Sequence, residues 1–206
     1  MIALIDYGAG NLTSVRKALS ALAADFRTPA SPTECAAADA IIVPGVGHFA
    51  ATSSLDDEWR EVIAGRTRQG VPLLGICLGM QWLFEGSEEA PKLAGLSLLE
   101  GRCARLAGDA ALGLKVPHVG WNQLDLRPSR MLADVQPGSQ VYFTHSYAAP
   151  VTADCVAETT HATRFAAAVE RGNVFGVQFH PEKSGDVGLQ ILRNFLNVVQ
   201  ANHRLS

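Results

Sequence analysis

The fold is decided by residues 73–81, Leu-Leu-Gly-Ile-Cys-Leu-Gly-Met-Gln. An apolar run leads up to Cys77, and the glycines Gly75 and Gly79 lie two positions to either side of it. This pattern predicts a buried strand that turns sharply into a helix at Cys77, an arrangement known as a nucleophile elbow. Bulky neighbours of Cys77 would collide with the strand and the helix. The helix N-terminus would offer unpaired N–H groups, which favour both a thiolate and an oxyanion.

The segments around this elbow predict strands that alternate with helices. Apolar periodicity indicates strands at residues 2–6, 40–43 and 71–76, separated by helices near residues 12–22 and 55–68. From about residue 96 short β-like runs follow, at 140–147, 154–159, 164–170 and 173–179, and a helix closes the chain. We therefore predict an α/β fold with an open mixed sheet, largely parallel and flanked by helices, in a single domain spanning residues 1–206.

The composition of the 206-residue chain excludes several protein classes. The 17 lysines and arginines against 20 aspartates and glutamates give a net charge of -3, without the basic excess of a nucleic-acid binder. The longest nearly apolar stretch, residues 73–84, is shorter than the roughly 20 residues that cross a membrane. Four cysteines without a C-x-x-C pattern, and no secretory leader, predict a cytoplasmic protein with free thiols.

A second motif supplies a candidate base for Cys77. Residues 176–182 read Gly-Val-Gln-Phe-His-Pro-Glu, and in an extended chain His180 and Glu182 would point the same way. The carboxylate could then orient the imidazole, which could take a proton from the thiol. Cys77 by itself could equally be a small buried apolar residue. Its combination with the His-Pro-Glu motif favours a catalytic Cys-His-Glu triad.

Other candidates have weaker support from the sequence. His145 has no carboxylate nearby in the sequence, so we expect a hydrogen-bonded core or rim histidine. The glycine-rich loop at residues 45–50 fits a dinucleotide-binding pattern only weakly. Its N–H groups, at Val46 or Gly47, could instead complete an oxyanion hole with the N–H of Leu78. We expect neither a cofactor nor a metal, because no metal-ligand spacing connects the cysteines with His48, His118, His161 and His203.

These motifs together resemble the class I, triad-type glutamine amidotransferases, which have a flavodoxin-like fold. Four further segments, at residues 6–12, 44–47, 116–122 and 145–147, narrow the resemblance to the glutaminase subunits of imidazole glycerol phosphate synthase. The matches run from residue 6 to residue 184. The chain departs from the family pattern at Val119, where methionine is common, and at Thr144, where an aliphatic residue is usual. Both departures concern local packing and leave the chemistry untouched.

The resemblance implies a reaction and a partner. Cys77 would attack the side-chain amide of L-glutamine, and His180, held by Glu182, would protonate the departing ammonia. Ammonia would pass to a separate (β/α)8-barrel cyclase subunit, which forms imidazole glycerol phosphate and AICAR in histidine biosynthesis. The resemblance also implies which residues bind the substrate and its oxyanion: Val46, Gly47, Leu78, Gln81, Ser146 and Tyr147. It implies that four more face the cyclase in a heterodimer: Asn11, Trp121, Asn122 and Lys183.

Two kinds of alternative remain open at this stage. The chain could serve another amidotransferase, such as that of pyridoxal phosphate synthesis, or act as a self-sufficient γ-glutamyl hydrolase. The segments at residues 6–12 and 116–122 speak against both. It could also be a catalytically silent partner module of the same fold, against which the intact triad argues. Trp121 as an ordinary core aromatic and Lys183 as a solvated surface charge are the corresponding structural alternatives.

Overall fold

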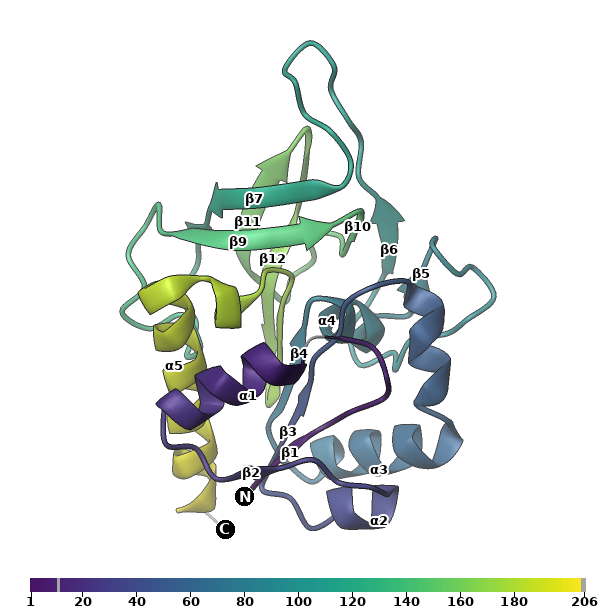
Figure 1. Cartoon of the computed structure of the whole chain (residues 1–206), viewed down its shortest axis with the longest axis vertical. Helices are drawn as coiled ribbons and strands as arrows, with labels where there is room; N and C mark the ends of the chain where they lie inside the picture. Colours follow the sequence, from purple (N-terminus) through teal and green to yellow (C-terminus); the bar gives the residue numbers. More distant parts are fainter. Residues whose placement is uncertain (11, 205–206) are drawn as a thin grey trace.

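The computed structural model describes residues 1–10 and 12–204 and is built around an eight-stranded mixed sheet (Figure 1). In spatial order the strands are β2 (Phe26–Arg27), β1 (Ile2–Leu4), β3 (Ala40–Val43), β4 (Leu73–Ile76), β13 (Val174–Val177), β12 (Thr163–Arg171), β11 (Cys155–His161) and β8 (Asp125–Leu126). The first five strands run parallel to one another, and the remaining pairs are antiparallel. The predicted open, largely parallel sheet is confirmed.

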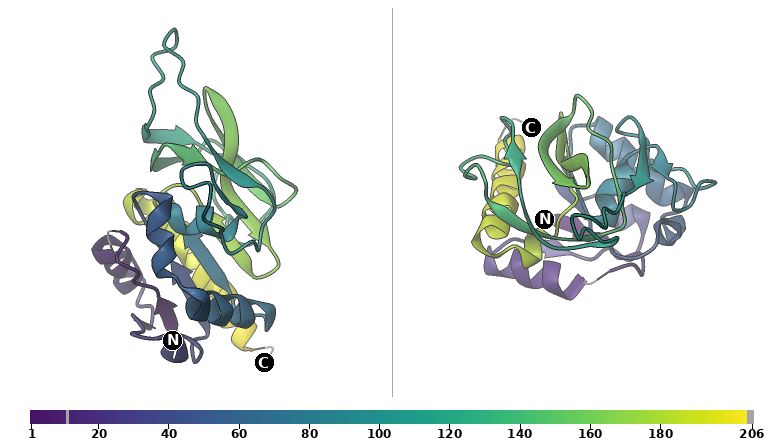
Figure 2. Two further views of the ribbon diagram at one scale, coloured as in Figure 1. Left: turned by 90° about the vertical axis from the view of Figure 1, so that its right-hand side faces the viewer. Right: turned by 90° about the horizontal axis from the view of Figure 1, so that it is seen from above.

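Helices cover both faces of this sheet, which is why its central strands are apolar on both sides. Alternate residues of β1 enter different cores: Ile2 and Leu4 pack on one face, and Ala3 packs on the other. The first face is covered by α1 (Leu12–Ala21) and α5 (Gly185–His203) (Figure 2). The second is covered by α2 (Pro32–Cys35), α3 (Asp57–Arg68) and α4 (Leu78–Leu83). None of the helices that the structure describes is long and apolar enough to span a membrane.

Two small sheets lie beyond the antiparallel half of the main sheet, and the sequence did not predict them. The strand β7 (His118–Gln123) pairs antiparallel with β9 (Gln140–His145), and these two strands lie above the helices in Figure 1. The other small sheet has the order β10-β6-β5, formed by β10 (Tyr147–Ala148), β6 (Arg102–Arg105) and β5 (Gly86–Ser87). The run expected at residues 140–147 is therefore two strands, because the chain leaves one sheet and joins another at Ser146. Residues 1–10 and 12–204 also include two short 3-10 helices, η1 (Phe49–Ser54) and η2 (Pro181–Lys183).

The elbow at Cys77 has the strained geometry that its sequence predicts. The φ of Cys77 is 54°, in the left-handed region that few residues other than glycine adopt. A Cβ on Gly79 would lie 1.7 Å from the carbonyl oxygen of Val43, and a Cβ on Gly75 would lie 2.7 Å from the backbone of Gly79. The helix α4 can therefore start directly after β4 only because neither glycine carries a side chain.

Replacement of Gly79 by alanine should lower the free energy of unfolding by about 1–3 kcal/mol, because the new methyl group must displace the Val43 carbonyl. The matched control is Gly65→Ala, since a Cβ on Gly65 in α3 would meet nothing closer than an Arg68 guanidinium nitrogen at 3.9 Å. That change should stabilise the protein by about 0.5–1 kcal/mol, as expected within a helix. Urea denaturation of the two variants measures the difference. Equal effects at the two sites would contradict this account of the elbow.

Candidate active site

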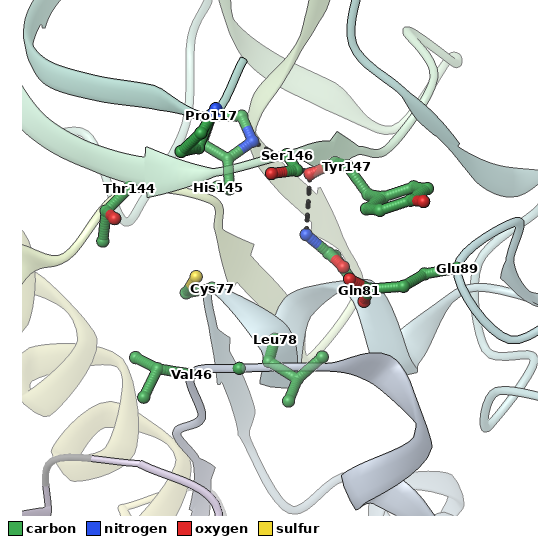
Figure 3. A pocket seen from close by; sticks show the side chains of 11 residues that line it. Val46, Cys77, Leu78, Gln81, Glu89, Pro117, Thr144, His145, Ser146 and Tyr147 are labelled. Atoms are coloured by element: carbon green, nitrogen blue, oxygen red, sulfur yellow. Dashed lines mark hydrogen bonds between the residues drawn. The ribbon is translucent and has the colours of Figure 1, made fainter.

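A cavity of about 300 Å³ opens between the elbow and the strands β9 and β10 (Figure 3). Cys77 lies on one side of it, and His145, Ser146 and Tyr147 lie across from Cys77. The cavity contains every residue that the sequence analysis assigned to the oxyanion and the substrate: Val46, Gly47, Leu78, Gln81, Ser146 and Tyr147. The sequence analysis gave no site role to four further lining residues, Glu89, Pro117, Thr144 and His145. The structure thus collects residues from five separate parts of the chain around one thiol.

A chain of buried amides connects this thiol with the opposite wall. The Sγ atom of Cys77 accepts a hydrogen bond from Gln178 Nε2 at 3.6 Å. Gln81 Nε2 donates to Gln178 Oε1 at 3.1 Å. It also donates to the backbone oxygen of Tyr147 at 2.8 Å, as the dashed line in Figure 3 shows. Gln178 is fully buried, and the sequence analysis quoted it in the His-Pro-Glu motif without giving it a role. Its position two residues before His180 is the feature of the sequence that could have indicated a place beside Cys77.

The candidate base and its carboxylate meet as expected, although by another route. The Nδ1–H of His180 donates to Glu182 Oε1 at 2.8 Å, and both side chains are almost fully buried. The extended geometry predicted for this pair is wrong, because β13 ends at Val177 and Pro181–Lys183 form the turn η2. This turn brings the carboxylate back to the imidazole. The other ring nitrogen, Nε2, is buried and has no hydrogen-bond partner among the described residues.

The charges around His180 favour its protonated form. Burial of the ring lowers its pKa, but the Cys77 thiolate and the Glu182 carboxylate outweigh burial and raise the pKa to about 10. A thiolate beside an imidazolium is the reactive form of a cysteine nucleophile. The arrangement can therefore supply both a nucleophile and a proton donor.

His145 has the opposite electrostatic environment, although it also lines the cavity. Burial lowers its pKa to about 3, and the charges of His118, His161 and His180 act in the same direction. Its hydrogen bond to the backbone oxygen of Tyr147, at 2.9 Å, only partly opposes this shift. His145 is thus the hydrogen-bonded, buried histidine that the sequence analysis expected. It stays neutral where His180 is charged, so the two imidazoles cannot exchange roles.

The loop at residues 44–47 engages the first N–H group of α4. Leu78 N–H donates to the backbone oxygen of Gly45 at 3.3 Å, so this donor is occupied in the structure described. Gly45 in turn packs on Tyr7, because a Cβ at Gly45 would lie 2.0 Å from the Tyr7 hydroxyl. The φ of Gly47 is +101°, which only glycine adopts easily. Val46, Gly47 and Leu78 surround the cavity as expected, but this loop conformation does not leave the Leu78 N–H free.

The residues expected at the partner interface are placed differently from one another. Trp121 is 55% exposed, so it is not a core aromatic, and its ring meets that of Tyr142 edge-on at 6.1 Å. Lys183 Nζ lies 5.8 Å from the same Tyr142 ring, which joins the three side chains in one surface cluster. Asn122 instead turns its amide inward and donates to the backbone oxygen of Thr160 at 3.1 Å. Asn11 lies outside the described residues.

The described residues include no group of three or more histidine, cysteine, aspartate or glutamate side chains placed to hold a metal ion. The cysteines are buried free thiols, at positions 35, 77, 103 and 155. The histidines that cluster beside the cavity direct their nitrogens at one another and at backbone carbonyls. Their arrangement fits a hydrogen-bonded structural element.

Residues 3–199 match the model of the family "Glutamine amidotransferase class-I". The imidazole glycerol phosphate synthase subunit HisH of Methanothermobacter thermautotrophicus is 43% identical over 98% of this chain and 100% of its own length. HisH of Moorella thermoacetica is 47% identical over 97% of this chain and 95% of its own, and HisH of Halalkalibacterium halodurans is 48% identical over 97% of both. The chain belongs to the HisH family of class-I glutamine amidotransferases. The resemblance inferred from the motifs is thereby confirmed.

Solved structures share the fold of this HisH-family chain. A crystal structure of a glutamine amidotransferase superposes with a TM-score of 0.75 at 19% identity, covering 97% of this chain and 98% of the other. The structure of PurLQS from Thermotoga maritima gives a TM-score of 0.70 at 18% identity, covering 95% and 97%. At such low identity these likenesses show the fold alone. They confirm the class I amidotransferase fold that the resemblance of the motifs implied.

Replacement of Cys77 by serine should lower the pKa of His180, because the thiolate that raises this pKa is removed while burial of the ring remains. NMR titration of the imidazole resonances measures the shift, and Cys35→Ala, at a buried thiol in α2, is the control. The raised pKa of His180 also stabilises the wild-type fold: this contribution is fully present below about pH 6.5 and is lost as the pH rises through about 10. An unchanged His180 titration in Cys77→Ser would rule out the thiolate–imidazolium pair.

Proposed function

We propose that this HisH-family chain hydrolyses L-glutamine to glutamate and ammonia at Cys77, and supplies the ammonia to a cyclase subunit in histidine biosynthesis. The observation that carries the proposal is the Cys77 thiol at the cavity, paired electrostatically with the buried His180–Glu182 couple. Family membership supports the assembly, since the relatives are named as subunits of imidazole glycerol phosphate synthase. The partner would be the (β/α)8-barrel cyclase, which forms imidazole glycerol phosphate and AICAR.

In the first half of the reaction, the Cys77 thiolate adds to the side-chain amide carbon of glutamine. The sulfur–carbon bond forms and the carbonyl oxygen becomes an oxyanion. His180 then gives its Nε2 proton to the amide nitrogen, the carbon–nitrogen bond breaks, and ammonia leaves a γ-glutamyl thioester. Glu182 keeps the ring in this orientation through its 2.8 Å bond to Nδ1. The position of the unpartnered, buried Nε2 supports this role.

In the second half, water replaces the sulfur. Neutral His180 takes a proton from the attacking water, and collapse of the new tetrahedral species expels the Cys77 thiolate and releases glutamate. The thiolate–imidazolium pair is thereby restored. These steps use only side chains and water, so the proposed chemistry needs no cofactor.

The walls of the cavity offer partners for the amino-acid part of glutamine. Ser146 and Tyr147 come from the junction of β9 and β10, and Gln81 comes from α4. Glu89 adds a carboxylate to the cavity, and its Oε2 accepts from the backbone N–H of Phe49 at 2.7 Å. A carboxylate in this place suits the α-ammonium group of the substrate. We therefore add Glu89 to the substrate-binding residues that the sequence indicated.

The occupied Leu78 N–H supports a regulated glutaminase. An oxyanion in the cavity needs the Leu78 N–H, which donates to the Gly45 oxygen in this structure. The loop at residues 44–47 must therefore change conformation before glutamine is hydrolysed efficiently. Docking of the cyclase would favour the turned loop through contacts that only this state makes. The exposed cluster of Trp121, Tyr142 and Lys183 is the surface that we assign to the partner.

The proposal extends to the organisation and location of the chain. Both apolar cores share the strands of one sheet, which supports a single amidotransferase domain over residues 1–206. A heterodimer with the cyclase in the cytoplasm follows from the proposed biosynthetic role. Asn122, whose amide is engaged internally, would contribute to the interface through its position beside Trp121.

Replacement of Cys77 by alanine should reduce glutamine hydrolysis by more than about 10³-fold, because no other nucleophile lies at the elbow. His180→Ala should cost nearly as much, and Glu182→Gln should cost less. Synthesis by the complex with added ammonium should survive in all three variants, since the cyclase then needs no glutaminase. Assays of glutamate release and ammonium-dependent synthesis test this, with Cys155→Ala as the control thiol. Substantial glutaminase turnover in Cys77→Ala would refute the proposal.

The isolated chain should hydrolyse glutamine about 10²–10³-fold more slowly than the complex with cyclase and its ligand, since one oxyanion donor is occupied. Lys183→Ala should reduce this stimulation more than it changes glutamine affinity, because Lys183 lies at the surface cluster and does not line the cavity. Steady-state kinetics of the free chain and the complex measure both quantities. Equal rates for the two forms would favour a self-sufficient hydrolase.

A further inference from the structure

Three buried histidines from three different strands pack together beside the cavity at Cys77, on the face of the β7–β9 sheet opposite to Trp121. His118 begins β7, His145 ends β9, and His161 ends β11. Phe143 and Phe165 pack around them. Buried imidazoles need hydrogen-bond partners, and the mechanism proposed above uses none of the three.

Two of these histidines form a directed hydrogen-bond ladder. The Nδ1 atom of His145 lies 2.9 Å from the backbone oxygen of Tyr147, which can only accept, so Nδ1 carries the hydrogen. His145 Nε2 is then the acceptor for His118 Nδ1–H at 3.1 Å. His118 Nε2 accepts in turn from Asn122 Nδ2 at 3.4 Å. The bonding partners therefore assign one tautomer to each ring.

Burial keeps this ladder neutral. It lowers the pKa of His118 to about 4 and that of His145 to about 3, and the neighbouring histidine charges act in the same direction. A protonated His145 would present an N–H to the N–H of His118. At neutral pH each ring therefore keeps one donor and one acceptor, and the order from Asn122 to Tyr147 is preserved.

The two ends of the ladder belong to two different surfaces. At the inner end, the Tyr147 oxygen also accepts from Gln81, so His145 and Gln81 together hold this cavity wall (Figure 3). At the outer end, Asn122 follows Trp121 on β7. A second cavity, of about 610 Å³, opens there and is lined by His118, Trp121 and Asn122. The ladder thus runs along one face of the β7–β9 sheet, from one cavity to the other.

We propose that His118 is a positioning residue for the cavity at Cys77: its Nδ1–H holds His145 in the tautomer that the Tyr147 oxygen requires, and it ties the Ser146–Tyr147 wall to the strand β7 that carries Trp121 and Asn122. The inference about substrate rests on the glutaminase function proposed above. Loss of the His118 donor leaves His145 Nε2 without a partner, so His145 can rotate or change tautomer and release the Tyr147 oxygen. If docking of the partner moves β7, the same hydrogen bonds would move the Ser146–Tyr147 wall of the cavity.

His161 provides a matched control for packing. Its ring stacks on His118 with centroids 4.2 Å apart, and it is similarly buried. Its Nε2–H donates to the backbone oxygen of Lys115 at 2.7 Å, outside the ladder. His161→Phe therefore removes a buried imidazole from the same stack without removing a ladder bond.

The test compares His118→Phe, His118→Asn and His161→Phe. Phenylalanine keeps the stacking ring without the donor, whereas the Nδ2 of asparagine can take the place of the histidine Nδ1. Nitrogen chemical shifts of labelled histidine in the full chain report the tautomer of His145. We expect the Nδ1–H tautomer in wild type, His118→Asn and His161→Phe, and its loss in His118→Phe. In the complex, His118→Phe should raise the KM for glutamine by about 3–10-fold, as loss of one hydrogen bond predicts, with a smaller change in kcat.

Two results would overturn the proposal: equal effects of His118→Phe and His161→Phe, or no restoration by asparagine. Should His118→Phe fail to fold, Asn122→Ala removes the outer donor of the ladder and must move the same His145 resonances in the same direction. An unmoved spectrum in that variant also refutes the ladder. The tautomer measurement needs no turnover. An active Cys77→Ala variant would therefore overturn the glutaminase proposal while leaving this test intact.

Discussion

The close approach of α4 to β3, at Gly79 against the Val43 carbonyl, is the constraint on which the site depends. It lets the chain reverse within one residue, so that Cys77 has a positive φ and its thiol faces the cavity. The same contact brings the first turn of α4 under the loop at residues 44–47, where Leu78 N–H meets Gly45. The close approach of Gly79 to Val43 thus places the nucleophile, the candidate oxyanion donor and the loop at residues 44–47 together.

Near Cys77, two buried imidazoles, His180 and His145, have opposite pKa shifts because their surroundings differ. His180 has a carboxylate and a thiolate as neighbours, which raise its pKa, whereas His145 has a backbone carbonyl and other histidines, and burial lowers its pKa. Both rings are buried, so burial alone does not decide their charge. The presence of negatively charged neighbours beside His180, and their absence beside His145, decides it. One ring is therefore suited to proton transfer and the other to holding a wall of the cavity.

Local patterns predicted most of the fold, because the central strands are apolar runs and the elbow needs its two glycines. They also indicated Cys77, His180 and Glu182. The strand β7 was missed because its outward face carries Val119 and Trp121 where a solvated strand would alternate with polar residues. The contacts of Glu89 and His118 depend on pairing between distant segments, so no local pattern could place them. The turn at Pro181–Lys183 likewise replaced the extended geometry expected there, because the strand ends earlier than its apolar run suggested.

The bond between Leu78 N–H and the Gly45 oxygen separates two kinds of reactivity at one sulfur. Attack on an amide creates a negative oxygen that requires a free backbone donor, whereas displacement of a halide by the thiolate creates none. In this conformation Cys77 should therefore meet simple alkylating agents as a competent nucleophile while remaining poorly equipped for its own substrate. The loop conformation therefore limits hydrolysis of an amide substrate, whereas it leaves the reactivity of the Cys77 sulfur toward alkylating agents unchanged.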